Sequence, residues 1–593
     1  SADDTLLSLE PFYAPEAKTR AEYKGRDVVL IGTDVGGDSQ TDSGYPRTVM
    51  EWRRGTPLTE AQVTYTGEKA DVAVSGAVSD QRSRGGRVYE WRHRSMTFYT
   101  SKQSIRTLTP SMENGAYTLT SAGDGNGLDG WRDVDIPEDA HCSLFGSQLI
   151  IEHRSEYLGH PAGSLLAVDL DNFLDKGAED CAAEGLVTTL FTPTDHRSLE
   201  GKRGTKNYLL VTMLEDVKTK LAFWQWDQGK WLSVGEESQA QIASSSCRPV
   251  DSDTVDTFWF TTSSFTAPST LYQADIAEYG TDCTKPENME FMKQLPQMFN
   301  ADGLSVQQMF ATSADGTKVP YFVVGKEGMP RDGSTPTILY GYGGFEVSLT
   351  PSYASIMGAG WLERGGCYVT ANIRGGGEYG PKWHRSALRE KRQNAYDDFI
   401  AVARDLIAQG ITSPKHLAAR GGSNGGLLMG NMLVQQPKGL WGAIHCAVPL
   451  LDMRRYHTLL AGASWMAEYG NPDTADWDEF LHKYSAYHVL LEMTGQGSGE
   501  QAQDSFSESV IDTPILFTTS TRDDRVHPAH ARKMVKALVD AQSKQGCVAS
   551  PVYYYENIEG GHKGAADNKQ QAFMQALTYE FLWKTVGPDA NVD

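Results

Sequence analysis

The chain has 593 residues, of which 40% are hydrophobic and 22% charged, which is typical of a globular protein of about two to four domains. Its 54 basic and 76 acidic residues give a formal net charge of −22. Such a field repels nucleic acids and anionic lipid surfaces, so we expect neither as a partner. No uninterrupted apolar run is long enough to predict a membrane span.

The cysteines and the N-terminal sequence bear on the compartment. The seven cysteines are scattered, with no C-x-x-C pair, and no H-E-x-x-H motif occurs. This pattern does not favour a disulfide framework or a metal site. We therefore predict a cytoplasmic protein without bound metal. The start, SADDTLLSLEPF, lacks the pattern of a signal peptide, and a periplasmic or secreted location stays open if one was removed.

Residues 1–295 read as a series of short strands. Segments 87–100, 207–215 and 220–234 are rich in aromatic and β-branched residues and are separated by turn formers such as GDGNGLDG at 123–130. Long helical periodicity is scarce in this half. Many short strands over about 300 residues favour a sandwich array or a β-propeller with blades of about 40–50 residues.

From residue 296 onward, apolar strands alternate with amphipathic helices. The runs at 335–344, 366–377 and 513–520 are typical of buried strands. Segment 397–410 places its apolar residues on one helical face and ends at a glycine, and 527–542 and 570–586 are further helices. This alternation predicts a mostly parallel sheet covered by helices on both faces.

The segment ARGGSNGGLL (419–428) holds a candidate nucleophile. Ser423 follows a predicted strand and precedes a predicted helix, as a nucleophile elbow requires. Gly421 and Gly425 relieve crowding at the sharp turn, and the helix N-terminus directs N–H groups at developing negative charge. A serine hydroxyl also needs a base held by an acid, and in α/β-hydrolases these follow in the order Ser, Asp or Glu, His.

Both partners occur in that order along the chain. The segment TRDDRVHP follows the strand at 513–520 and offers Asp523 or Asp524 as the acid. The segment ENIEGGHKG places His562 in a glycine-rich loop just before the last helix. The pattern alone leaves the choice between the two adjacent aspartates open.

A second glycine-rich motif could indicate a dinucleotide-binding site. GGGEYG (375–380) fits G-x-G-x-x-G, and Asp397 and Asp398 lie about 20 residues further on. A dinucleotide site needs a helix that opens at the third glycine, whereas Pro381 and KWHRSA follow here. We therefore expect no nucleotide and no other cofactor.

Five motifs in order closely resemble the prolyl oligopeptidase family of serine peptidases. They are LYGYGGFEVSLTPSY, ANIRGGGEYGPKWH, GGSNGGLL, DDRVHP and GGHKG, and the resemblance covers roughly residues 299–593. The first half is compatible with the family's seven-bladed propeller, and residues 41–58 look like propeller sequence of bacterial relatives. The resemblance implies a β-propeller over 1–295, an α/β-hydrolase catalytic domain over 296–593, and an active site between them.

The resemblance also implies roles for individual residues. Ser423 matches the nucleophile and His562 matches the general base. Asp523, the first of the two adjacent aspartates, matches the acid. Tyr342 matches the tyrosine whose hydroxyl joins the N–H of Asn424 in the oxyanion hole.

A substrate pocket is implied in the same way. Trp465, in GASWMAEYG, matches the indole that stacks on the substrate's proline ring. Phe345, Tyr469 and Val526 match other walls of that pocket, and Arg525 matches the guanidinium that holds a substrate carbonyl. An aromatic slot suits a proline ring, whereas a pocket for Arg or Lys needs a buried carboxylate, which none of these positions supplies.

We therefore predict a monomeric serine endopeptidase that cleaves short peptides after proline through an acyl-enzyme. An alternative is a related hydrolase with other selectivity: a dipeptidyl-peptidase, an acylaminoacyl-peptidase or an esterase. A more distant alternative is a propeller binding protein with an inactive hydrolase domain. About 295 residues before the hydrolase domain are few for seven blades and the family's N-terminal segment, so we expect a lost N-terminus or a reduced propeller.

Overall fold

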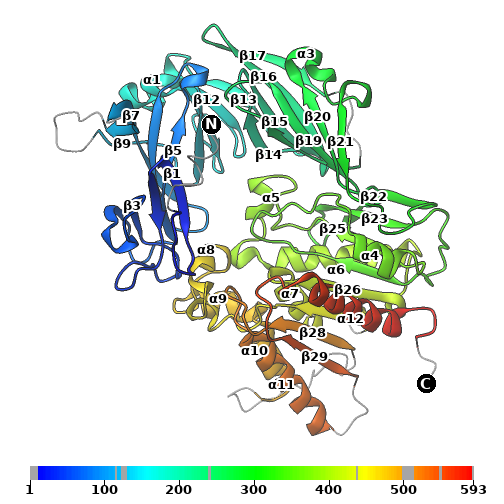
Figure 1. Ribbon diagram of the computed structural model, residues 1–593. Helices are drawn as coiled ribbons and strands as arrows, with labels where there is room; N and C mark the ends of the chain where they lie inside the picture. Colours follow the sequence, from blue (N-terminus) through cyan, green and yellow to red (C-terminus); the bar gives the residue numbers. More distant parts are fainter. Residues whose placement is uncertain are drawn as a thin grey trace.

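The computed structural model describes residues 11–113, 116–121, 130–237, 242–435, 439–496, 513–545 and 550–590. A series of small antiparallel sheets forms an arc in the first half, and one large sheet flanked by helices forms the second half (Figure 1). The fold is thus a β-propeller-like domain followed by an α/β-hydrolase domain. Within the described ranges, no helix has the length and apolar character needed to cross a membrane.

Five sheets of consecutive, antiparallel strands make up the first half, and β9 adds to the second of them. Their strands are β1 (Arg20–Gly25), β2 (Val28–Gly32), β3 (Thr48–Arg53) and β4 (Gln62–Thr66); β5 (Ala73–Asp80), β6 (Val88–Ser95), β7 (Ser101–Glu113), β8 (Ala116–Ser121) and β9 (Arg132–Asp133); β10 (Ala140–Phe145), β11 (Gln148–His153), β12 (Leu165–Asp169) and β13 (Thr188–Phe191); β14 (Arg197–Gly204), β15 (Tyr208–Glu215), β16 (Lys218–Asp227) and β17 (Lys230–Glu236); β18 (Ser244–Pro249), β19 (Thr257–Ser263), β20 (Thr270–Asp275) and β21 (Glu290–Gln294). Short helices α1 (Leu170–Lys176), α2 (Ala178–Ala183) and α3 (Ile276–Tyr279) lie in the connections.

Central strands in the middle of this series are buried on both faces. On β11, Leu149 and Ile151 pack in one hydrophobic cluster with Val168 of β12, whereas Ile150 packs in another with Leu165. Successive side chains of a strand point to opposite faces, so the sheet β10–β13 separates two cores. This explains why the strands read as continuous apolar runs, and it favours the stacked sheets of a propeller over a sandwich. The predicted turn at 123–130 lies outside the described residues except for Gly130.

The second half is built on one eight-stranded sheet in the order β22-β23-β25-β24-β26-β27-β28-β29. The pairs β22–β23 and β23–β25 are antiparallel, and all later pairs are parallel. The strands are β22 (Leu304–Thr312), β23 (Lys318–Lys326), β24 (Thr337–Tyr340), β25 (Cys367–Ala371), β26 (Leu417–Gly422), β27 (Ala443–Ala447), β28 (Ile515–Ser520) and β29 (Val552–Asn557). The helices are α4 (Ser355–Met357), α5 (Pro381–Arg385), α6 (Gln393–Ala408), α7 (Asn424–Val434), α8 (Met466–Tyr469), α9 (Asp476–Glu479), α10 (Ala486–Met493), α11 (Ala529–Gln545) and α12 (Asn568–Val586).

Helices cover both faces of this sheet, as the alternation of strands and helices predicts. Leu339 of β24 faces the core under α6 and α7, and its neighbour Ile338 faces the core under α12. The helix predicted at 397–410 begins earlier, at Gln393, because Tyr396 is also buried in the core. β21 ends at Gln294 and β22 begins at Leu304, and a domain boundary at 295–296 stays a prediction.

The glycines of GGGEYG have a packing role. A Cβ atom on Gly375 would lie 2.4 Å from the carbonyl oxygen of Gly343, and one on Gly377 would lie 2.4 Å from that of Glu346. Gly375 also has a φ of +95°, which side chains rarely adopt. The glycine run therefore lets the loop after β25 pack directly against the loop after β24.

Glu378 of the same motif is a buried carboxyl group. Its Oε1 accepts hydrogen bonds from the N–H of Leu349 (2.9 Å) and from Asn372 Nδ2 (3.0 Å). Its Oε2 has no hydrogen-bond partner among the described residues. Burial raises the pKa of Glu378 to about 7, even though both hydrogen bonds favour the charged form.

Folding stability should therefore depend on the charge of Glu378. The ordinary pKa of a glutamate side chain is 4.5. Between pH 4.5 and about 7, the folded state therefore binds the proton of Glu378 more tightly than the unfolded state does. Stability should fall as pH rises through this window and stay lower above it. Glu378→Gln cannot ionise, so it should be more stable than wild type at pH 8, by up to about 3 kcal/mol, and show little gain at pH 5.

Urea unfolding at both pH values measures this difference. Exposed Glu327→Gln controls for the change in net charge. An equal effect of Glu378→Gln at pH 5 and pH 8 would contradict the expected ionisation.

Candidate active site

Ser423 lies at a strained turn between β26 and α7. Its backbone has φ 60° and ψ −117°, outside the regions that L-residues ordinarily occupy. A Cβ atom on Gly421 would lie 2.3 Å from the carbonyl oxygen of Gly425, and one on Gly425 would lie 2.7 Å from that of Gly341. The two glycines of G-x-S-x-G are thus required by close backbone contact, as expected for a nucleophile elbow.

The serine, histidine and first aspartate predicted from the sequence lie in hydrogen-bonding contact. His562 Nε2 is 3.1 Å from Ser423 Oγ, and His562 Nδ1 is 2.7 Å from Asp523 Oδ2. Asp523 follows β28 and His562 follows β29, so neighbouring parallel strands bring them to the same edge of the sheet. Because the carboxylate can only accept, Nδ1 donates to it, and Nε2 is left to accept the serine proton.

The backbone fixes the orientation of Asp523. Its Oδ1 accepts hydrogen bonds from the N–H groups of Arg525 (2.9 Å) and Val526 (2.8 Å), and its side chain is completely buried. Asp524 is exposed to solvent. This geometry distinguishes Asp523 from Asp524, a choice that the sequence pattern alone left open.

Exchange of each aspartate for asparagine should therefore have unequal effects. Asp523→Asn removes the acceptor that holds the histidine tautomer, so kcat should fall by about 10³–10⁴-fold. Asp524→Asn is the matched control and should change kcat by less than about tenfold. Steady-state kinetics on one peptide substrate measures both, and a larger loss for Asp524→Asn would contradict this assignment.

Tyr342 and Asn424 are joined directly. Asn424 is the first residue of α7, where helix N–H groups have no partner within the helix. Its side-chain Nδ2 donates to the carbonyl oxygen of Tyr342 (2.6 Å), and its Oδ1 accepts from Tyr469 Oη (2.8 Å). Burial raises the pKa of Tyr342 to about 12, although the nearby charge of Arg525 acts in the opposite direction. The phenol therefore keeps its proton and can donate a hydrogen bond at neutral pH.

The predicted pocket residues belong to one hydrophobic cluster. Trp465, Tyr469 and Val526 are buried in it, and half-buried Phe345 packs against it. The rings of Phe345 and Tyr469 meet edge to face with centroids 5.7 Å apart. Arg525 lies beside this region and is exposed to solvent.

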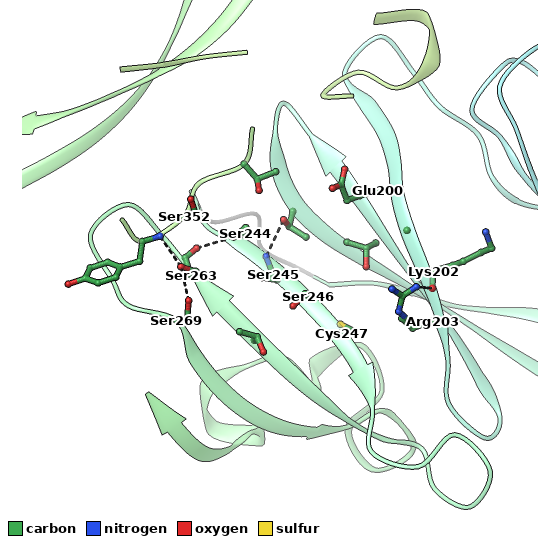
Figure 2. A pocket seen from close by; sticks show the side chains of 16 residues that line it. Glu200, Lys202, Arg203, Ser244, Ser245, Ser246, Cys247, Ser263, Ser269 and Ser352 are labelled. Atoms are coloured by element: carbon green, nitrogen blue, oxygen red, sulfur yellow. Dashed lines mark hydrogen bonds between the residues drawn. The ribbon is translucent and has the colours of Figure 1, made fainter. Parts of the chain in front are cut away.

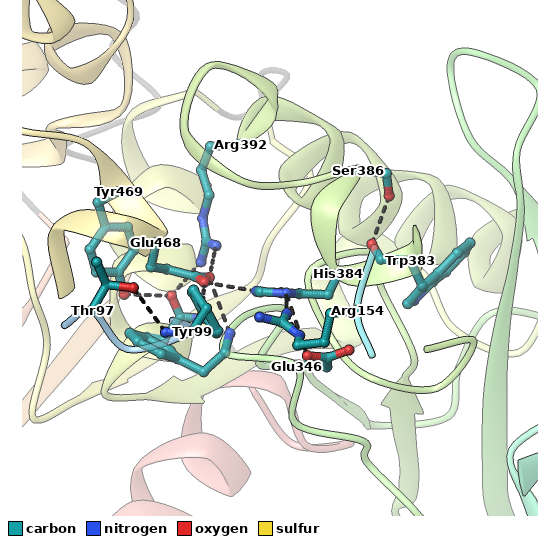
Figure 3. A network of polar contacts seen from close by, with 12 residues as sticks. Thr97, Tyr99, Arg154, Glu346, Trp383, His384, Ser386, Arg392, Glu468 and Tyr469 are labelled. Carbon is teal, nitrogen blue, oxygen red and sulfur yellow. Dashed lines mark hydrogen bonds and ion pairs between the residues drawn. The ribbon is translucent and has the colours of Figure 1, made fainter. Parts of the chain in front are cut away.

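The propeller-like domain contributes side chains that the sequence analysis missed. Phe98, in the turn between β6 and β7, contacts Phe345 with ring centroids 5.1 Å apart. Tyr99 donates a hydrogen bond to Glu468, and the Arg154 guanidinium lies 2.7 Å from His384 Nδ1 (Figure 3). These pairs are separated by hundreds of residues, and no local motif signals them. Glu468 does lie inside GASWMAEYG, between Trp465 and Tyr469.

Cavities lie where the halves of the chain meet, and two of them share a lining residue. One, of about 300 Å³, is lined by residues of both halves, including Phe98 and Phe345. The other, of about 510 Å³, is lined largely by serine and threonine hydroxyls, among them Ser245 of β18 and Ser263 of β19 (Figure 2). Glu200 lines both cavities. Within the described residues, no group of three or more His, Cys, Asp or Glu side chains is arranged to hold a metal ion.

Comparison with known proteins identifies the family. Residues 353–589 match the Prolyl oligopeptidase family, and residues 158–286 match the Prolyl oligopeptidase N-terminal beta-propeller domain. The chain is 36% identical to the uncharacterized peptidase y4nA of Sinorhizobium fredii over 587 residues, which covers 97% of this chain and 72% of the relative. The chain belongs to the prolyl oligopeptidase family. It is a serine peptidase of that family, as the sequence motifs predict.

Other relatives carry more specific names. A prolyl endopeptidase of Elizabethkingia miricola is 37% identical over 319 residues, which covers 54% of this chain and 41% of that protein. A solved structure of a post-proline cleaving enzyme from Rickettsia typhi superposes with a TM-score of 0.80 at 28% identity, covering 96% of this chain and 75% of that one. The family membership is thus accompanied by a shared architecture over nearly the whole chain.

Proposed function

We propose that this family member cleaves short peptides on the carboxyl side of proline, with Ser423 as the nucleophile. The contact of Ser423 Oγ with His562, which in turn contacts buried Asp523, carries this proposal. The names of the Elizabethkingia and Rickettsia relatives support the choice of proline.

The reaction follows from these contacts. His562 Nε2 takes the proton of Ser423 as the oxygen attacks the scissile carbonyl, and Asp523 stabilises the imidazolium that forms. The N–H of Asn424 and the hydroxyl of Tyr342 stabilise the negative oxygen of the tetrahedral intermediate. His562 then donates its proton to the leaving amine, and water hydrolyses the acyl-enzyme through the same steps.

Substrate selectivity would come from the aromatic cluster beside the serine. Trp465 stacks on the proline ring, and Phe345, Tyr469 and Val526 form the other walls. No acidic side chain belongs to this set, and the nearby carboxylate of Glu468 is already paired with Arg392, so these walls offer a basic residue no free carboxylate. The Arg525 guanidinium, exposed next to Asp523, would hold a substrate carbonyl.

Loss of the Ser423 hydroxyl should abolish turnover while leaving the fold intact. We expect Ser423→Ala to lower kcat by roughly 10⁴-fold or more and to abolish labelling by a fluorophosphonate probe. Ser543→Ala, an exposed residue of α11, is the matched control and should keep both. Retention of a tenth of the activity by Ser423→Ala would refute the assignment. Failure of the wild type to label would instead favour a non-catalytic binding protein.

Two pocket substitutions test the proline preference. Trp465→Ala removes ring stacking and buried area, so kcat/KM should fall about 10–100-fold for a proline substrate and distinctly less for the matched alanine substrate. Arg525→Ala should slow both substrates together, because every peptide offers a carbonyl, and a charged hydrogen bond contributes about 1.5–3 kcal/mol.

The measurement compares each variant with each substrate, and active-site titration corrects for misfolded enzyme. If Trp465→Ala lowers kcat/KM equally for both substrates, the indole has a structural role only and does not select proline. A wild-type preference for arginine at the cleaved position, or for esters, would favour one of the other selectivities.

A further inference from the structure

Glu468 of α8 is a fully buried carboxylate whose two oxygens have different partners (Figure 3). Its Oε1 accepts hydrogen bonds from the N–H of Phe345 (3.1 Å) and from Arg392 Nη1 (2.8 Å), both in the hydrolase half. Its Oε2 accepts from Tyr99 Oη and from His384 Nε2 (2.9 Å). One carboxylate thus links two separate sets of groups.

The Oε1 partners lead to the proposed oxyanion hole. Arg392 also donates a hydrogen bond to Asn424 Oδ1, and Asn424 Nδ2 donates to the carbonyl oxygen of Tyr342. A Cβ atom on Gly344 would lie 2.5 Å from Asn424 Nδ2 and 2.9 Å from Glu468 Oε1. The loop that carries Tyr342 is therefore packed directly against Asn424 and Glu468.

The Oε2 partners lead to the propeller-like domain. Tyr99 lies in the turn between β6 and β7 and reaches Glu468 directly. Arg154, just after β11, lies 2.7 Å from His384 Nδ1. Because a guanidinium can only donate, His384 accepts at Nδ1 and donates at Nε2 to Glu468. The Arg154 guanidinium also pairs with Glu346 (2.5 Å) and lies 4.4 Å from the centre of the Tyr99 ring.

The hydrogen-bond donors around Glu468 keep its buried carboxylate ionised. Burial alone raises the pKa of Glu468, but the His384 hydrogen bond and the Arg392 charge outweigh it, so the pKa lies below its usual range. A buried, ionised carboxylate is stable only while donors surround it. Removal of one donor to Oε2 favours a new orientation of the carboxylate toward the remaining donors. Because Phe345 and Arg392 donate to Oε1, such a change also alters their hydrogen bonds.

We propose that Tyr99 is a positioning residue for the oxyanion hole, acting through Glu468, Arg392 and Asn424. The inference rests on the proposed function, because it takes Tyr342 and Asn424 as the groups that stabilise the tetrahedral intermediate. The propeller-like domain then contributes to the rate of the chemical step, in addition to any effect on substrate entry.

The test compares two Tyr→Phe variants that each remove one hydroxyl between the halves of the chain. Tyr99→Phe removes the donor to Glu468, and Tyr379→Phe removes a hydrogen bond to Asp216 Oδ1 (3.2 Å), which is not one of the hydrogen bonds to Glu468. We expect Tyr99→Phe to lower kcat about tenfold with KM within about twofold, and Tyr379→Phe to leave kcat within about twofold. Active-site titration gives the concentration of competent enzyme.

A peptidyl aldehyde supplies a readout that a merely structural role would not move. Its adduct with Ser423 places an oxyanion where the intermediate has one, so its affinity reports on the oxyanion hole. For Tyr99→Phe, aldehyde affinity should fall by the same factor as kcat/KM. Noncovalent binding of the same peptide, measured in a Ser423→Ala background, should not change.

Three results would overturn the inference in an enzyme whose wild type is active: an unchanged kcat in Tyr99→Phe, equal losses in both tyrosine variants, or a loss of kcat without a loss of aldehyde affinity. A wild type that neither labels with fluorophosphonate nor cleaves peptides would overturn the proposed function itself, and the inference with it.

Discussion

Close packing of backbone around Ser423 is the constraint on which the rest of the site depends. The turn after β26 is possible only because Gly421 and Gly425 have no side chains, and the carbonyls of Gly341 and Gly425 occupy the space that Cβ atoms would need. The same contact brings the loop after β24 beside the first turn of α7, so Tyr342 and Asn424 lie next to the serine. Parallel strands β28 and β29 then deliver Asp523 and His562 to the same edge. A strained residue is thus held by the sheet beneath it and by the loops around it.

Around this centre, polar groups are buried where the two halves of the chain meet. The fully buried carboxylate of Glu468 and the guanidinium of Arg392 form an ion pair of 2.8 Å. Burial of charge costs free energy unless the partners are well placed, and removal of one partner from such a pair leaves the other charge buried without compensation. The hydroxyl-rich cavity differs in character, because its serine and threonine side chains are small, uncharged and able both to donate and to accept hydrogen bonds.

Local sequence contains the signals for much of this architecture. The apolar alternation and the glycine pattern around Ser423 predict strand, turn and helix because each depends on residues within a few positions of one another. The resemblance singles out Asp523, and the geometry places it against His562, where the pattern alone could not choose between neighbours. The early start of α6 at Gln393 was missed because burial of Tyr396 depends on tertiary packing.

The contacts that join the halves were also beyond reach from the sequence. Tyr99 and Glu468 are 369 residues apart, and neither lies in a periodic pattern that shows it is paired. Phe98 reads as one aromatic residue of a strand-rich segment, yet it packs on Phe345. Such contacts follow from the docking of one domain on another, which single-sequence patterns do not encode.

The arrangement of the propeller-like sheets determines how a loss of packing in one sheet affects the stability of the others. Because Leu149 and Ile150 of one strand enter different cores, a sheet in the middle of the arc has no hydrophobic core of its own and shares one with each neighbour. Its stability is then a property of two interfaces, as in stacked repeat proteins. Loss of packing inside one such sheet weakens the sheets on both sides, and by that route reaches the turn that carries Phe98 and Tyr99.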